Sequence, residues 1–148
     1  MAEVNVVDLP EQPIAVIKDR AKQSELSQKV PDYCGKVWNF IKANNIKSNG
    51  RMVATYRGND MNDLQIEVGA QVDAPFKEDG NVVNSLLPAG KAAMVTHVGP
   101  YNELPKAYDD LFTWCKQNGH QTGVCWELYH HPSPDGPPKT DIYAHLKS

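Results

Sequence analysis

The most regular alternation of apolar and polar residues lies between residues 64 and 72. Every second residue in this segment is apolar, namely Leu64, Ile66, Val68, Ala70 and Val72. The residues between them are polar or glycine. A period of two is typical of a β-strand with one buried face, because successive side chains of an extended chain project to opposite sides. This segment therefore predicts a strand that lies against a core.

Residues 30–41 carry apolar side chains at a helical spacing instead. Val30, Tyr33, Val37 and Ile41 recur every three or four residues and would share one helix face. Pro31 fits the first turn of a helix better than its interior, so we expect this helix in two pieces. The two asparagines at positions 44 and 45 mark its end.

A second helix is predicted in the later part of the chain. Its buried face is marked by four residues at helical spacing, Leu104, Tyr108, Leu111 and Cys115. Asn102 is a suitable N-cap, and Pro105 is tolerated in the first turn. Gly119 is expected to close this helix.

The remaining short apolar runs are bounded by turn residues and predict strands. They span residues 3–9, 14–18, 52–56, 82–86, 91–98, 124–130 and 140–146. The polar stretch from Asp19 to Gln23 is expected to be a loop, residues 74–80 a linker, and the proline-rich residues 132–138 a long turn.

Strand, helix, strand and strand thus follow one another twice, over about residues 3–74 and about residues 81–147. This order predicts an α+β fold of two βαββ repeats in a single domain over residues 1–148. The strands would form antiparallel sheet with the helices on one side, which leaves the other side free to curve around a ligand.

Aligning the two repeats isolates one unusual residue. When Gly50 is placed on Gly123, Tyr56 falls on Tyr129 and Ala54 falls on Glu127. Only the second repeat therefore carries a carboxylate in the middle of an aromatic strand. Because duplicated halves tend to leave a cleft between them, we expect this acid on one wall of such a cleft.

Composition and charge exclude several classes of protein. The 148 residues are 41% hydrophobic and 22% charged, which is ordinary for a globular domain and argues against disorder. The formal net charge of −3 and the lack of a lysine or arginine run give no reason to expect nucleic-acid binding. No apolar run is long enough to cross a bilayer, and the N-terminal residues do not resemble a secretory signal. Three cysteines without a C-x-x-C spacing favour a reduced, cytoplasmic location.

The strand around Glu127 carries the candidate chemistry. Alternation places Cys125, Glu127 and Tyr129 on one face, with Trp126 and Leu128 on the other. We expect Trp126 and Leu128 beneath the helix, so that Glu127 and Tyr129 look into the open groove. A partly desolvated acid favours a flat, apolar ligand with a positive charge, and aromatic walls add cation–π attraction. In the alternative interpretation, Glu127 lies at a sheet edge and pairs with a lysine, at position 91 or 139.

Other residues could complete this groove. Tyr101 follows a Gly-Pro turn and would contact the ligand or act as a weak acid, although it could also fasten a strand to its helix. His97 shares a strand face with apolar residues and is more typical of a core or rim position than of a catalyst. Three tyrosines and a tryptophan could line the groove or simply pack, namely Tyr33, Tyr56, Tyr108 and Trp38. No metal or cofactor motif is present, so neither a metal nor another cofactor is expected.

Four segments of the second half resemble one known family, the GyrI-like small-molecule-binding domain with its SOUL-like fold. They are Leu87 to Lys91, His97 to Tyr101, Leu111 to Trp114, and Trp126 to Tyr129. The family supplies the effector-binding module of AraC- and MerR-type multidrug-responsive regulators. The resemblance implies a pseudo-twofold pair of βαββ units with a groove for lipophilic, often cationic, aromatic compounds. It also implies that Glu127 contacts the positive charge and that Tyr101 lines the pocket.

The resemblance leaves three functional hypotheses open. The first is a standalone cytoplasmic binding protein, monomeric or homodimeric, that senses or sequesters such compounds. In the second, a hydrolase opens cyclopropane-type alkylating compounds, with Glu127 acting on a water and Tyr101 donating a proton. In the third, the domain inhibits a protein partner such as gyrase. With no DNA-binding domain in the sequence, direct regulation of transcription is not expected.

Overall fold

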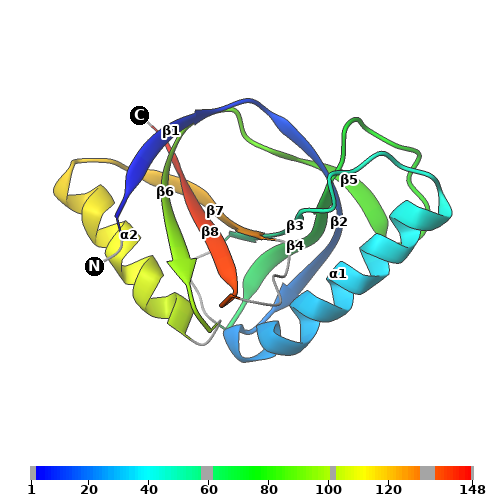
Figure 1. Cartoon of the computed structure of the whole chain (residues 1–148), viewed down its shortest axis with the longest axis horizontal. Helices are drawn as coiled ribbons and strands as arrows, with labels where there is room; N and C mark the ends of the chain where they lie inside the picture. Colours follow the sequence, from blue (N-terminus) through cyan, green and yellow to red (C-terminus); the bar gives the residue numbers. More distant parts are fainter. Residues whose placement is uncertain (1–2, 58–61, 101–102, 131–135, 148) are drawn as a thin grey trace. The chain divides into compact units, whose positions relative to one another are not determined.

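The computed structural model describes residues 3–57, 62–100, 103–130 and 136–147, and it divides into two compact units (Figure 1). Unit 1 comprises Met1–Pro10 and Pro88–Ser148, and unit 2 comprises Glu11–Leu87. The predicted α+β class is confirmed, because each unit combines antiparallel strands with one α-helix.

Unit 2 is a four-stranded antiparallel sheet with the strand order β5-β2-β4-β3. Its elements are β2 (Gln12–Ala21), a 3-10 turn η1 (Gln23–Glu25), α1 (Leu26–Ala43), β3 (Met52–Arg57), β4 (Leu64–Gln71) and β5 (Val82–Leu87). Val37 and Ile41 of α1 pack on Ala15, Ala70 and Val72 on one face of the sheet. The alternation between residues 64 and 72 thus gives a strand with a buried, helix-covered face, as predicted.

Two local predictions for unit 2 are wrong. The segment after Lys18 is not a loop, because β2 continues to Ala21 and pairs there with β4. Nor does Pro31 divide the helix, since α1 is continuous from Leu26 to Ala43. Pro31 and Ser27 are both exposed, so water can reach the carbonyl that lacks the proline's amide hydrogen.

Unit 1 is a second four-stranded antiparallel sheet, with the strand order β1-β6-β8-β7. Its elements are β1 (Asn5–Leu9), β6 (Gly90–Val98), α2 (Leu104–Gln117), β7 (Thr122–Tyr129) and β8 (Lys139–Leu146). Leu111 and Cys115 of α2 pack on Ala93, Val95 and Ile142. This core covers one face of the sheet, as the helical spacing of residues 104–115 predicts.

The ends of α2 agree only in part with the prediction. The helix has Glu103 as its N-cap residue, one position after the predicted cap, and Asn102 lies outside the described residues. Pro105 lies in the first turn, as expected. Gly119 follows the helix with a φ of 74°, a left-handed conformation that glycine adopts without steric cost. Neither α1 nor α2 offers an apolar stretch of the length that a bilayer crossing requires.

The edge strands are exchanged between the two repeats. β1 precedes the first βαββ segment in the chain but pairs with β6, and β5 precedes the second segment but pairs with β2. Each sheet therefore has, as one edge strand, the segment that directly precedes the repeat of the other sheet in the chain. Three of the four strands in each sheet still follow the repeated strand, helix, strand, strand order.

Candidate ligand-binding site

Glu127 lies on β7 in the interior of unit 1, where only 5% of its surface is exposed. Its carboxylate accepts two hydrogen bonds from phenols. Tyr108 Oη of α2 donates to Oε2 at 2.5 Å, and Tyr129 Oη of β7 donates to Oε1 at 2.6 Å. Among the described residues, no lysine, arginine or histidine forms an ion pair with this carboxylate. Lys91, one of the two partners considered from the sequence, pairs with Asp8 instead, at 3.3 Å.

The predicted orientation of this strand is wrong. Glu127 pairs across the sheet with Ile142, which belongs to the core beneath α2, and Tyr108 comes from α2 itself. The acid therefore lies on the helix-covered face of the sheet. Trp126 lies on the opposite face and stacks on Tyr143, with ring centroids 5.2 Å apart. On the helix side of the sheet, Tyr108 donates a hydrogen bond to Glu127. On the other side, Trp126 stacks on Tyr143.

A second carboxylate, in unit 2, shows what Glu127 lacks. Asp19 accepts a hydrogen bond from Tyr33 at 2.5 Å and pairs with the Lys29 ammonium at 3.0 Å, and these contacts lower its pKa. Burial raises the pKa of Glu127, and the hydrogen bonds from its two tyrosines offset only part of that rise. Each acid accepts a hydrogen bond from a tyrosine, but of the two only the partly buried Asp19 has a cationic partner among the described residues.

The other predicted residues fall into three groups. His97 lies on β6, and its Nε2 is 2.9 Å from the carbonyl oxygen of Pro100. Tyr101 lies outside the described residues, so both its pocket role and its catalytic role remain predictions. Three candidates belong to unit 2: Tyr33 bonds Asp19, Trp38 packs against the core beneath α1, and Tyr56 lies half-buried on β3. Direct hydrogen bonds therefore join three of the predicted residues, Glu127, Tyr108 and Tyr129.

Cys125 shares the face of Glu127 but offers no nucleophile. It packs against the core beneath α2, and burial raises the pKa of its thiol to about 12. The thiol is therefore protonated near neutral pH, whereas a nucleophilic cysteine needs its thiolate form.

The sequence interpretation missed one polar residue on this face. Thr140 of β8 lies directly opposite Tyr129 of β7 and directly opposite His97 of β6. It is completely buried, and its hydroxyl has no hydrogen-bond partner among the described residues. The period of two that groups Ile142, Ala144 and Leu146 extends back to Thr140, and this signal could have identified it.

The family model of the GyrI-like small-molecule-binding domain matches residues 2–147. The chain belongs to the GyrI-like family. The resemblance noted in the four segments of the second half is thereby confirmed, and the domain is a small-molecule-binding domain by family. No curated protein sequence matches it significantly.

Solved structures share the fold of this GyrI-like domain. The C-terminal domain of EcmrR has 22% sequence identity and a TM-score of 0.83, with 100% of this chain and 99% of that chain covered. In an EcmrR–DNA complex the identity is 22% and the TM-score 0.79, over 98% of this chain but 57% of that chain. SAV2435 bound to tetraphenylphosphonium has 12% identity and a TM-score of 0.69, over 99% of this chain and 94% of that chain.

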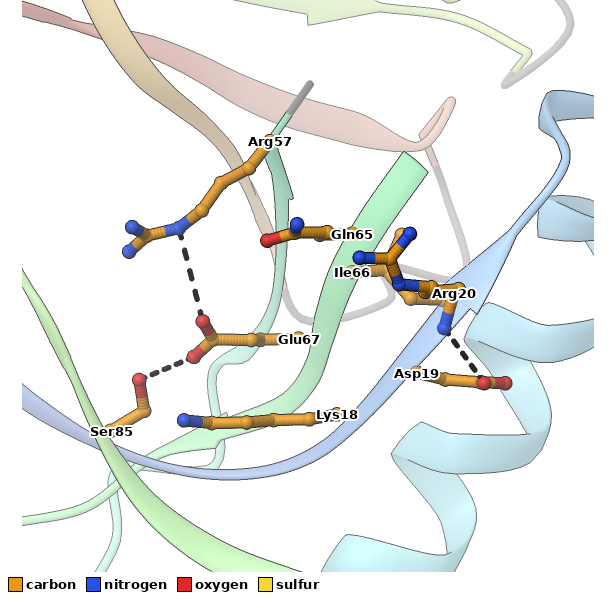
Figure 2. A pocket seen from close by; sticks show the side chains of 8 residues that line it. All are labelled: Lys18, Asp19, Arg20, Arg57, Gln65, Ile66, Glu67 and Ser85. Carbon is orange, nitrogen blue, oxygen red and sulfur yellow. Dashed lines mark hydrogen bonds and ion pairs between the residues drawn. The ribbon is translucent and has the colours of Figure 1, made fainter. Parts of the chain in front are cut away.

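Unit 2 of the GyrI-like domain also contains an open hollow of about 660 Å³ (Figure 2). It is lined by Lys18, Asp19, Arg20, Arg57, Gln65, Ile66, Glu67 and Ser85. Most of its charged groups are already engaged with one another or with neighbours. Arg20 pairs with Asp63 at 2.8 Å, and Glu67 accepts a hydrogen bond from Ser85 and lies 3.9 Å from Arg57. This polar, open surface is less suited to a lipophilic ligand than the buried acid of unit 1. Within the described residues, no cluster of His, Cys, Asp or Glu could hold a metal ion.

The raised pKa of Glu127 predicts a pH-dependent stability. Its folded-state pKa exceeds the unfolded value of 4.5, so its favourable contribution is complete below that value and is lost as pH rises through the raised pKa. Glu127→Gln removes the charge and should therefore be more stable than wild type at pH 8, by on the order of 1 kcal/mol, with the advantage shrinking toward pH 4. Urea unfolding between pH 4 and 8 measures this difference.

Asp19→Asn provides a control of opposite sign. Because the pKa of Asp19 is lowered, its stabilising contribution is present above the unfolded pKa and is lost as pH falls through the folded pKa. The Asn variant should thus be no more stable than wild type at pH 8. A Glu127→Gln variant that is less stable than wild type at pH 8 would show that burying the ionised carboxylate does not destabilise the folded protein.

Proposed function

We propose that this GyrI-like domain binds lipophilic aromatic cations at Glu127. The supporting observation is a carboxylate that is 5% exposed, is held by two phenols, and has no cationic partner among the described residues. Removing an unpaired charge from water is costly unless a countercharge meets it. A ligand that brings a positive charge would supply what the protein side chains around Glu127 do not.

The two tyrosines favour a particular kind of cation. Each oxygen of Glu127 already accepts a hydrogen bond, from Tyr108 or from Tyr129. An ammonium ion with N–H groups would compete with these phenols for the carboxylate oxygens. A phosphonium or quaternary ammonium ion needs no hydrogen bond, so it can neutralise Glu127 through Coulomb attraction while both phenols remain in place. The phenol rings would add cation–π attraction of about 0.5–2 kcal/mol.

Access to this acid requires a local rearrangement. Because Glu127 is almost fully buried beneath α2, a ligand can contact it only after neighbouring side chains move. The binding energy must therefore exceed the cost of this opening.

The binding of tetraphenylphosphonium by SAV2435, a protein of the same fold, supports this choice of ligand class. Such a site would select its ligands by positive charge and aromatic contact, with few directional hydrogen bonds. It could therefore accept several different compounds, as a role in sensing or sequestering multiple drugs requires. The hydrolase and gyrase-inhibitor hypotheses remain predictions, because the first depends on Tyr101 and the second on a partner surface that no described feature identifies.

Two ions of nearly the same shape test the proposal. Tetraphenylphosphonium is a cation, and tetraphenylborate is the corresponding anion. Isothermal titration should give a Kd in the micromolar range for the cation, which corresponds to about −8 kcal/mol, and binding at least tenfold weaker for the anion. Equal affinity for the two ions would show that apolar area alone drives binding, and the proposed role of Glu127 would be rejected.

A further inference from the structure

The hydroxyl of Thr140 is a buried polar group with no hydrogen-bond partner in the described part of the chain. The residue is 0% exposed, and its Oγ1 accepts or donates no hydrogen bond among the described residues. Buried hydroxyls are satisfied in the large majority of folded proteins, because an unmade hydrogen bond is costly once water is excluded. Within a helix, threonine could bond the carbonyl three or four residues earlier, but an extended strand does not bring that carbonyl within reach.

The position of Thr140 relates it to the proposed ligand site. It alternates along β8 with Ile142 and Ala144, which pack beneath α2, so its side chain lies on the helix-covered face. On that face its cross-strand neighbour is Tyr129, whose phenol donates to Glu127. Glu127 itself pairs with Ile142, two residues along β8 from Thr140. The unpaired hydroxyl and the unpaired charge are thus neighbours on one face of the sheet.

We propose that Thr140 hydrogen-bonds a polar group of the ligand that Glu127 binds. This inference rests on the proposed function and narrows it. The preferred ligands are aromatic cations that carry a hydroxyl, amine or carbonyl group close to the charged centre. Glu127 selects the charge, and Thr140 selects among cations by the position of that second group. The Thr140 hydroxyl is buried and lies opposite Tyr129. It should discriminate strongly between cations, because a ligand without a matching polar group leaves this hydroxyl without a hydrogen bond.

Threonine 55 provides a matched control in unit 2. It is also buried, at 2% exposure, and its hydroxyl also has no hydrogen-bond partner among the described residues. However, Thr55 pairs with Glu67 on the sheet face that points away from α1, and the Glu67 carboxylate, unlike that of Glu127, lies near a cation, 3.9 Å from Arg57. Thr55→Val and Thr140→Val therefore make the same chemical change, but only the second variant should alter ligand selection.

The test compares tetraphenylphosphonium with the 2-, 3- and 4-hydroxyphenyl isomers of (hydroxyphenyl)triphenylphosphonium. We expect at least one isomer to bind wild type five- to tenfold more tightly than tetraphenylphosphonium. This advantage should fall below twofold in Thr140→Val and persist in Thr140→Ser and Thr55→Val. The affinity for tetraphenylphosphonium itself should change less than twofold in all three variants, because this ion has no group for Thr140 to bind. Thr140→Ala removes the same hydroxyl and replaces Thr140→Val if the valine variant does not fold.

The outcomes separate this proposal from the proposed function. If wild type binds tetraphenylphosphonium but prefers none of the isomers, or if Thr140→Val retains the preference, the role of Thr140 is rejected and the cation site stands. If wild type binds tetraphenylborate as well as tetraphenylphosphonium, or binds neither, the proposed function is rejected and the role of Thr140 falls with it. An equal loss of affinity for all four cations in Thr140→Val would indicate a structural role, and would also overturn the proposal.

Discussion

Replacing Glu127 with glutamine should weaken the binding of tetraphenylphosphonium by about 10- to 100-fold, which corresponds to about 1.4–2.8 kcal/mol. Glutamine keeps the length and shape of the side chain and can still accept a phenol hydrogen bond. It removes the negative charge, which acts at 5% exposure and is therefore screened little by water. It also replaces one acceptor oxygen with an amide NH2 group, to which one of the two phenols can present its oxygen as acceptor. Isothermal titration at pH 8 measures the effect, because the wild-type carboxylate is ionised to a greater extent there than at lower pH.

A second acid gives the control for this substitution. Glu67 of unit 2 also accepts a side-chain hydrogen bond, from Ser85, but it lies near Arg57 in the open hollow of Figure 2. Glu67→Gln should leave tetraphenylphosphonium affinity within twofold of wild type. If Glu127→Gln also stays within twofold, or if Glu67→Gln causes an equal loss, Glu127 is not the charge that binds the cation.

The binding of a cation should also reverse the pH behaviour of Glu127. A bound cation favours the ionised carboxylate, so it opposes the rise in pKa that burial causes. Affinity for the cation should consequently increase with pH through the raised pKa, while the stability of the free protein decreases over the same range. Raising the pH should thus lower the stability of the free protein and raise its affinity for the cation, both through the Glu127 carboxylate.

Local patterns predicted the elements of this fold well, because burial on one side of a strand or helix leaves a period in the sequence. The alternation from residue 64 to 72 and the helical spacing from residue 104 to 115 both mark faces that the structure buries. The errors occurred where non-local contacts decided the outcome. β2 extends through Asp19 because β4 offers backbone partners there. α1 continues past Pro31 because the turns that follow the proline pack on the sheet through Val37 and Ile41.

Hydrogen bonds join three of the predicted site residues, Glu127, Tyr108 and Tyr129, but the predicted orientation of their strand is wrong. Alternation correctly grouped Glu127 with Tyr129, yet it could not show which face of β7 meets α2. By hydropathy alone, the more apolar pair, Trp126 and Leu128, is predicted to face the helix. The stacking of Trp126 on Tyr143 and the hydrogen bond from Tyr108 join segments far apart in the chain, and no local period records them. The exchange of β1 and β5 between the repeats escaped prediction for the same reason.

Truncation of Leu111 is the change with the largest expected effect on stability. Leu111 is 0% exposed and lies at the centre of the contact between α2 and the sheet of unit 1, where it packs among Val95, Ile142 and Cys115. Leu111→Ala removes buried methyl and methylene groups and leaves a cavity, so the free energy of unfolding should fall by about 2–5 kcal/mol. Urea unfolding followed by circular dichroism measures this loss.

An exposed residue of the same helix separates packing from helix propensity. Thr113 lies two positions after Leu111 in α2 and is exposed. Thr113→Ala should change the free energy of unfolding by less than about 0.5 kcal/mol, because this surface substitution removes no buried contact. Leu111→Ala should also weaken tetraphenylphosphonium binding, since Tyr108 comes from the preceding turn of α2 and depends on its packing to reach Glu127. If Leu111→Ala costs no more stability than Thr113→Ala, then α2 is not held on the sheet by this core, and the burial of Glu127 beneath it would need another cause.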